Sequence, residues 1–583
     1  MASFTRFLAQ KRTLSPLHKA EGQLATLFTP SDWLVASLFI GALVIGAGIL
    51  FAQASLAVSI EVPVQGGVHR EGVVGTPRFI NPLLATSEVD RDLATLLYGG
   101  LMKSTPGGGV VPYLAERYEI SEDGIEYTFF LKDNIFFHDG SPITAEDVVF
   151  TVQAAKNPDI KSPRRANWEG VEVVATDPKT VVFTLRAPYA LFLENTTMGI
   201  LPKRLWEGVN AEEFPFTDLN TSPIGSGLYR VESVKKNSSG VPVSYTLAAS
   251  QTADVRPYIS RMLFTFYPND EALERAYAAR EIGAAHSIVP GDTGNNSVIE
   301  EAVFARIFGV FFNQNQQEIF ANEVVRRALD QALDKRALIA TVVNGYGSPL
   351  SGPLPPESVS SAETDTVSAE EKIARAASLL EGDGWKRGED GVYEKTINKE
   401  TRRLAFSLAT ANAPELKASA ELVAATWRSL GAEVSLQFFE QNDLTLEVLR
   451  PRTYDALLFG LVVGRELDLF AFWHSSQRND PGLNIALYAN ITTDKLLEEA
   501  RNELSSEARR ESARKAAEEI ASETAAVFLY APHFTYVHGP ELRGVAVGTV
   551  ATPADRFAGV ESWYVQTERV WNIFARSQPV TSY

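Results

Sequence analysis

Cysteine is absent from the 583 residues of this sequence. Its absence excludes disulfide bonds, thiol catalysis, iron–sulfur clusters, thiolate zinc sites and a lipid anchor on an N-terminal cysteine. The composition, 45% hydrophobic and 22% charged, is that of an ordinary globular protein. Stability must therefore come from packing, and any attachment to a membrane must come from a device other than a lipidated cysteine.

Excess positive charge and catalytic motifs are lacking as well. The formal net charge is −18, and nucleic-acid binding needs clustered Lys and Arg, so no nucleic-acid partner is expected. The seven histidines form no HExxH motif, and neither GxSxG nor GxxxxGK[ST] occurs. We therefore expect no enzyme activity, no cofactor and no metal site.

One long uncharged run lies near the N-terminus, from Trp33 to Ile60. About 20 apolar residues suffice for a helix to span a bilayer, so residues 33–55 are predicted to be a transmembrane helix. The preceding 1–32 are then a cytoplasmic tail with more basic than acidic residues, and the body that follows is acidic. This asymmetry predicts a single-pass cell-membrane protein with its body on the extracytoplasmic side.

Two alternatives remain for this run. The first is a cleaved signal peptide, with Ala52-Gln53-Ala54 as the cleavage site. Its charged n-region would be unusually long, and its apolar run exceeds the usual length of about 7–15 residues. The second is a buried core helix. The missing lipidation cysteine favours the uncleaved anchor, because an extracellular body needs some tether.

The chain between Leu114 and Phe150 carries three local signals in succession. Apolar and polar residues alternate between Glu126 and Lys132, which predicts a half-buried strand. His138-Asp139-Gly140 forms a tight turn. Thr144 followed by Asp147 is a capping box that opens a helix. The segment is therefore predicted to be a strand, a turn and a helix.

This segment also resembles the signature of the family 5 extracellular solute-binding proteins, which are the oligopeptide- and dipeptide-binding receptors of ABC importers. Two later segments resemble the same family, and the similarity runs from about Val68 to Arg576. The segments that carry it are Lys132-Asp133, Phe137-His138-Asp139-Gly140, Thr144-Ala145-Glu146-Asp147-Val148, Pro223–Tyr229 and Arg327–Lys335.

The resemblance implies an α/β, two-lobed periplasmic-binding-protein-like fold of the large, three-subdomain type, in addition to the transmembrane helix. A monomer is expected. The implied domains are a linker at 56–67, a first lobe at 68–304 with an inserted subdomain at about 101–215, a second lobe at 305–525, and closing strands at 526–583 that return to the first lobe.

Within the second lobe, alternating strands and helices predict a sheet covered by helices. Periodicity predicts single helices over Ala321–Ala340 and Thr493–Glu523, and a strand over Tyr454–Val462. Two closing strands are expected at Val527–Tyr530 and Phe534–Val537.

The candidate ligand-binding residues lie between Gly464 and Ser476, directly after the strand Tyr454–Val462. The carboxyl end of a strand is where α/β units place ligands. The resemblance implies that an acid here binds the amino terminus of a peptide and that aromatic residues line the cleft, although the proline of the family is missing. The alternative is an acidic loop capped by packed aromatics. The candidates are Asp468, Glu466, Phe470, Trp473 and Ser475.

Together these features predict a membrane-tethered binding protein. It would capture a peptide or other small solute by closing two lobes, and deliver it to the permease subunits of an ABC importer. One alternative is a tethered sensor or chaperone with the same fold and no transporter. An extracellular peptidase would need a catalytic constellation that the sequence does not contain.

Overall fold

The computed structural model describes residues 29–253, 255–286, 288, 296–359, 367–397 and 399–575. Most of the predicted cytoplasmic tail lies outside these residues. The chain divides into two compact units, one of Met1–Val64 with Thr567–Ser582 and one of Gln65–Gln566.

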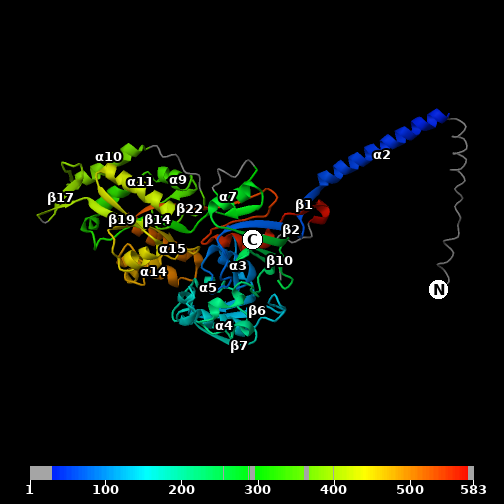
Figure 1. Cartoon of the computed structure of the whole chain (residues 1–583), viewed down its shortest axis with the longest axis horizontal. Coiled ribbons are helices and arrows are strands. Elements are labelled where there is room, and N and C mark those ends of the chain that lie inside the picture. The colour runs from blue at the N-terminus through cyan, green and yellow to red at the C-terminus, as the bar shows by residue number, and fades with distance from the viewer. Residues whose placement is uncertain are drawn as a thin grey trace. The chain divides into compact units, whose positions relative to one another are not determined.

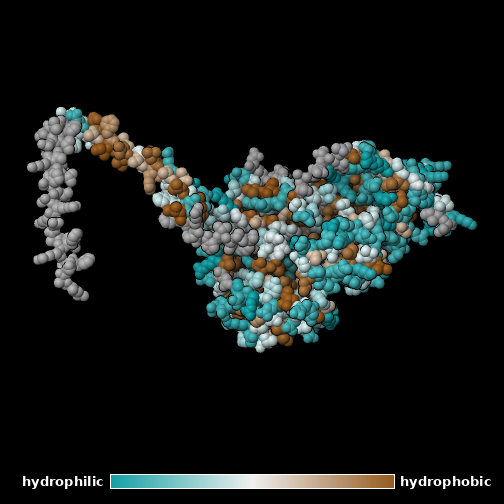
Figure 2. Space-filling model, turned by 180° about the vertical axis from the view of Figure 1, so that it is seen from behind, coloured by the Kyte–Doolittle hydropathy of each residue, from teal (hydrophilic) through white to brown (hydrophobic). Residues whose placement is uncertain are grey.

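The smaller unit is built around helix α2 (Pro30–Val58). Its N-cap is Thr29, which forms a capping box with Asp32. Most of its residues are apolar, and they appear brown in Figure 2. Strand β1 (Ser59–Pro63) follows at once and pairs antiparallel with β23 (Thr567–Trp571). The segment predicted as a linker is thus partly helix and partly strand. A short helix, α16 (Asn572–Ala575), ends the unit.

The first lobe of the larger unit holds one end of a 12-stranded sheet, in the order β12-β2-β11-β10-β9. Strand β2 pairs in parallel with β11, and β9, β10 and β11 form antiparallel hairpins. The elements of this part are β2 (Gly66–Val74), β9 (Tyr229–Lys236), β10 (Pro242–Ala249), β11 (Ile259–Tyr267), β12 (Ala284–His286), α3 (Glu88–Leu97) and α7 (Asp270–Ala278).

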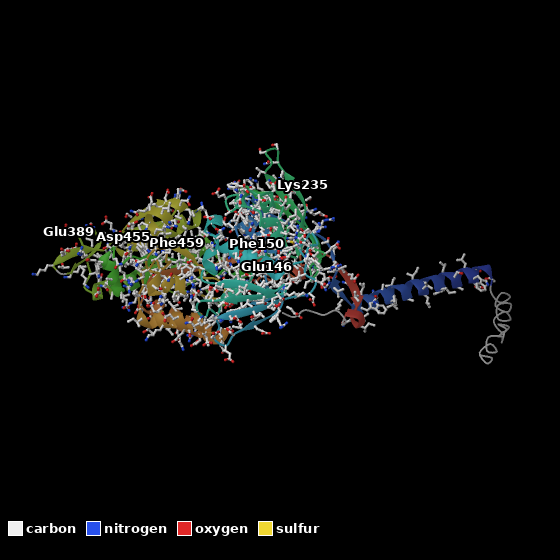
Figure 3. All side chains as sticks on the ribbon, turned by 90° about the horizontal axis from the view of Figure 1, so that it is seen from below. Glu146, Phe150, Lys235, Glu389, Asp455 and Phe459 are labelled. Carbon is white, nitrogen blue, oxygen red and sulfur yellow. The ribbon has the colours of Figure 1, made fainter. Side chains whose placement is uncertain are left out.

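An antiparallel sheet in the order β5-β6-β8-β7 forms a separate layer inserted into this lobe. The alternation in β6 buries Tyr127 and Phe129, as the sequence predicts. The capping box of α4 is also confirmed, since Asp147 Oδ2 accepts the Thr144 N–H at 2.8 Å. Figure 3 labels Glu146 on this helix. The elements are β3 (Met102–Ser104), β4 (Val110–Pro112), β5 (Ala115–Ile120), β6 (Glu126–Leu131), β7 (Glu172–Asp177), β8 (Thr180–Thr184), α4 (Ala145–Lys156), α5 (Phe192–Asn195) and α6 (Lys203–Trp206).

The second lobe holds the other end of the large sheet, in the order β20-β19-β21-β14-β22, with buried apolar clusters on both faces. Figure 1 shows α10 and α11 beside β14 and β19, and Figure 3 labels Asp455 and Phe459 at β21. The elements are β14 (Arg306–Phe312), β15 (Gly347–Pro349), β16 (Lys386–Arg387), β17 (Tyr393–Ile397), β18 (Glu400–Arg403), β19 (Ala405–Ala411), β20 (Glu433–Phe439), β21 (Ala456–Val462), α8 (Glu323–Gln331), α9 (Lys335–Val342), α10 (Ala369–Gly382), α11 (Pro414–Leu430), α12 (Gln441–Asp443), α13 (Phe470–Trp473), α14 (Ile491–Asn502) and α15 (Ser506–Ser522).

Two predicted single helices are each broken in two. The first run ends at Gln331, and Asp334 then caps α9 by accepting the Ala337 N–H. Likewise, Ser505 caps α15 by accepting the Ala508 N–H. Short polar side chains bond the backbone locally and so favour a helix start over continuation. Apolar residues keep a helical spacing across each break, which is why the sequence predicted a single helix in both places.

Strand β22 (Ala526–His538) links the two lobes. The sequence predicted two strands here, and the structure has one. Its first half pairs with β14, and its second half pairs with β12 and β13 (Val298–Val303). The short connection from β13 to β14 crosses beside it. The lobes are therefore joined by extended segments.

Candidate functional site

A cavity of about 430 Å³ lies where three parts of the larger unit meet. Residues between Pro82 and Leu228 form the first-lobe wall. Among the described residues, the second lobe contributes the loop residues Val463, Gly464, Arg465, Glu466 and Asp468. The chain after β22 contributes residues between Ala551 and Glu561. Because β21 ends at Val462, this loop stands at the carboxyl end of a strand, as the sequence predicts. The volume falls within the range of small-molecule sites.

Two helical segments form one wall of the cavity. Helix α3 begins at Ser87, whose hydroxyl accepts the Asp90 N–H at 3.1 Å, and it turns Arg91 and Thr95 toward the cavity. The 3₁₀ helix η9 (Pro553–Ser562) begins with a capping box in which Asp555 accepts two backbone N–H groups. These caps fix where each helix starts and hence which side chains line the site.

A buried charge network fastens this wall to the sheet. Arg556 on η9 donates to Asp92 on α3 at 3.0 and 2.6 Å and to Glu71 on β2 at 3.1 and 2.9 Å. All three side chains are 0% exposed. Burial raises the pKa of Asp92 to about 6, although the positive charge of Arg556 acts to lower it. Burial acts on Glu71 too, but Arg556 and His69 outweigh it and lower its pKa to about 2.

The two candidate acids, Glu466 and Asp468, both line the cavity. Each carboxylate is also held by an arginine of its own lobe. Asp468 Oδ2 lies 2.9 Å from Arg501 Nη2, and Glu466 Oε2 lies 2.8 Å from Arg509 Nη2. A ligand amino group would therefore have to compete with, or share, these guanidinium groups.

The other three candidates, Phe470, Trp473 and Ser475, are not among the described residues that line the cavity. Helix α13 turns Trp473 into the core of the second lobe, where it is 0% exposed. Phe470 stacks on His474 with ring centroids 4.1 Å apart, and the Ser475 hydroxyl donates to Asp494 at 2.5 Å. Aromatic residues do line the cavity, but they come from the first lobe and η9: Tyr98, Tyr113, Trp168, Tyr189 and Phe557.

Sequence reasoning missed the contact that joins the two walls. Arg465 Nη2 of the second lobe lies 2.9 Å from Glu194 Oε2 and 2.5 Å from Ser104 Oγ of the first lobe. Burial raises the pKa of Glu194, and the nearby charge of Glu466 adds to this rise while Arg465 opposes it. The second oxygen of Glu194 is buried with no hydrogen-bond partner among the described residues. Glu194 lines the cavity, but this oxygen is enclosed by protein atoms.

Comparisons with known proteins decide the family. The family model of bacterial extracellular solute-binding proteins, family 5, matches residues 109–481, well over half of the chain. The chain belongs to this family. As a family 5 protein it is a solute-binding receptor of the ABC-importer type and not an enzyme.

Similar proteins support this assignment. The oligopeptide-binding protein AppA of Bacillus subtilis is 26% identical over 551 residues, which cover 91% of this chain and 97% of that protein. The dipeptide-binding protein of Escherichia coli is 24% identical over 461 residues, covering 73% and 82%. The solved structure of AppA with a nonapeptide matches with a TM-score of 0.65 at 26% identity, covering 87% of this chain and 100% of that one. The two-lobed fold expected from the sequence is thereby confirmed.

Proposed function

We propose that this family 5 protein captures a peptide-like solute in the interlobe cavity and delivers it to the permease subunits of an ABC importer. One observation carries the proposal: the cavity is lined from both lobes, and the lobes are joined by the continuous strand β22. A hinge of this kind lets the lobes open to admit a solute and close around it. The oligopeptide- and dipeptide-binding relatives favour a peptide.

Within this cavity, Asp468 and Glu466 are the proposed anchors for a positively charged group of the solute. Their partners Arg501 and Arg509 come from the same lobe, so the pairs can persist when the lobes separate. A carboxylate has four acceptor directions and can serve an arginine and an ammonium at once.

Helix α2 is the proposed membrane anchor, with the body on the extracytoplasmic side. Ser31–Val58 is long and apolar enough to cross a membrane by its length and composition. Its large side chains are exposed, among them Phe39 at 73% and Leu43 at 72%. Leaving so much apolar surface in water would be costly, which favours a lipid environment.

Two experiments test this proposal. Isothermal titration of the purified protein with peptide pools should show saturable binding with no change in peptide mass, whereas no binding of any pool would contradict peptide capture. Membrane fractionation should find the intact chain in the membrane, and deletion of residues 1–60 should release a soluble, folded body. A mature chain that begins near Ser55 would instead show that the segment is cleaved.

A further inference from the structure

The charged side chains around the cavity are unevenly paired. Every acidic residue of the lining accepts a hydrogen bond. Four of them form ion pairs, namely Glu194 with Arg465, Glu466 with Arg509, Asp468 with Arg501, and Glu561 with Lys103. The fifth, Asp555, accepts from backbone N–H groups. Arg91 and Arg164 also line the cavity. Among the described residues, neither guanidinium forms an ion pair or a hydrogen bond. Backbone N–H groups leave the negative charge of Asp555 in place, so the lining charges without an ion-pair partner among the described residues are those of Arg91, Arg164 and Asp555. Positive charge is in excess among these three, although the whole chain carries −18.

The two arginines are held close enough to repel each other. Arg91 stands in the first turn of α3, and Arg164 directly precedes the 3₁₀ helix η2 (Arg165–Trp168). Surrounding protein atoms lower the pKa of Arg164, and the charge of Arg91 lowers it further, while Asp555 opposes them. Arg164 is nonetheless exposed as a whole residue, and it lines the cavity.

A third arginine stands near this pair on the second-lobe side. Arg306 begins β14 beside the connection between the lobes, and its Nε is buried with no hydrogen-bond partner among the described residues. Burial lowers its pKa, and Arg91 adds to that effect while Glu415 and Glu88 oppose it. Positive charge thus extends from the cavity wall toward the hinge.

We propose that Arg91 and Arg164 form an anion-binding subsite of the cavity, so that the captured solute carries a carboxylate or phosphate group. The inference rests on the proposed function in one respect, that this cavity is where the solute binds. Two like charges without partners are costly to hold together, and an anion between them removes the repulsion. Guanidinium groups present paired donors that match a carboxylate or phosphate, which makes arginine well suited to such a site.

The subsite is on the first lobe, whereas the proposed amino-group anchors Asp468 and Glu466 are on the loop of the second lobe. A zwitterionic peptide would therefore place opposite charges on opposite lobes. Contacts of its carboxylate with Arg91 and Arg164 on one lobe, and of its amino group with the other lobe, would stabilise the closed arrangement. A phosphorylated small molecule offers the same anionic chemistry from a different source.

The test uses the full chain in detergent and isothermal titration. One pair of probes is a tripeptide pool without Asp or Glu, with either a free carboxyl or a carboxamide end; the second set is inorganic phosphate and a sugar phosphate. The variants are Arg91→Gln, Arg164→Gln and the double substitution. Arg165→Gln is the matched control, because Arg165 is exposed and does not line this cavity. Thermal melting confirms that each variant is folded.

We expect the free-carboxyl pool to bind the parent about 10- to 100-fold more tightly than the carboxamide pool, as for loss of a charge-assisted hydrogen bond. The double variant should lose this preference, and Arg165→Gln should keep it. If only the phosphate probes bind, and only when both arginines are present, the subsite stands while the peptide part of the proposed function fails. Equal binding of acid and amide pools with no arginine-dependent phosphate binding would overturn the subsite but leave peptide capture intact. Failure of every probe to bind the parent would overturn both.

Discussion

The carboxylate of Asp468 lies against the guanidinium of Arg501, with Oδ2 and Nη2 2.9 Å apart. Asp468 is at the cavity, and Arg501 is the penultimate residue of α14. Arg501 also covers the ring of Phe470, with its central carbon 4.1 Å from the ring centroid. The pairing makes two roles for Asp468 distinguishable: it either anchors a solute or only holds Arg501.

The two roles predict different changes in peptide affinity for two substitutions, at Asp468 and at Arg501. If Asp468 anchors an amino group, Asp468→Asn weakens binding of a free-amino peptide, whereas Arg501→Gln strengthens it by releasing the carboxylate. We expect a loss of about 30-fold or more for the first, since it removes a charge partner at a cavity. Titration with matched free and acetylated peptides measures both. If both substitutions weaken binding alike, Asp468 serves only to position Arg501.

Replacing Arg556 should destabilise the protein strongly. Arg556→Met leaves Asp92 and Glu71 buried without their shared cation, which typically costs about 3–5 kcal/mol of the free energy of unfolding. Urea denaturation measures the change. Arg261→Gln is the control, because the Arg261–Glu232 pair is exposed and should matter little. Similar small effects in both variants would contradict the role given to the network.

Acid should weaken the fold through His138. Its Nε2 lies 3.1 Å from the carbonyl of Gly227, and its Nδ1 accepts the Gly225 N–H at 3.4 Å, so the ring fits only as the neutral form. Burial lowers the pKa of His138 to about 4. In the unfolded chain the His138 ring is protonated below about pH 6.5, whereas in the folded chain it is protonated only below about pH 4. The free energy of unfolding contributed by this residue therefore falls as the pH falls through that window.

His138→Gln removes this titration. The difference in unfolding free energy between parent and variant should shift toward the variant between pH 6.5 and 4. Taking a difference also cancels His286, whose pKa is lowered by burial to about 3 and which acts in the same direction. A parent–variant difference that stays constant across the window would refute the assignment.

The ion pair between Arg465 and Glu194 should favour the closed arrangement of the lobes. Arg465→Gln removes an interaction in which the arginine side chain is only 9% exposed. A smaller closed population lowers the apparent affinity for any solute in proportion. Titration with a binding peptide should show a several-fold loss in this variant, and no loss in Arg402→Gln, whose pairs lie within the second lobe. Equal affinities in parent and Arg465→Gln would contradict this role.

Local features of the fold could be predicted from the sequence, and tertiary pairings could not. Thr144 and Asp147 predict the start of α4, because both residues of a capping box lie within one turn of the chain. The strand before Gly464 likewise locates the loop of the cavity. The partner of Asp468 is 33 residues away and that of Arg465 is 271 residues away, and neither separation leaves a pattern in the sequence.

Trp473 illustrates the same limit on a smaller scale. Its position next to Asp468 suggested an aromatic wall of the cleft, but a four-residue helix is too short to show which face is buried. The core around it is assembled from Phe311 and Phe528 on two distant strands. The aromatic lining instead comes from the first lobe, where no motif marked it.

The central claim is that a solute draws the two lobes together, and a distance across the cleft tests it most directly. The chain has no cysteine, so Glu122→Cys and Glu507→Cys introduce two unique labelling sites, both exposed and on opposite lobes. They flank a close approach of the lobes, where a β-carbon built at Gly124 would lie 3.6 Å from Leu504. Pulsed electron–electron double resonance measures the distance between spin labels at these two sites. Without peptide the distance distribution should be broad. With a peptide that titration shows to bind, it should be narrow and centred at a shorter distance. An unchanged distribution at saturating peptide would contradict the account.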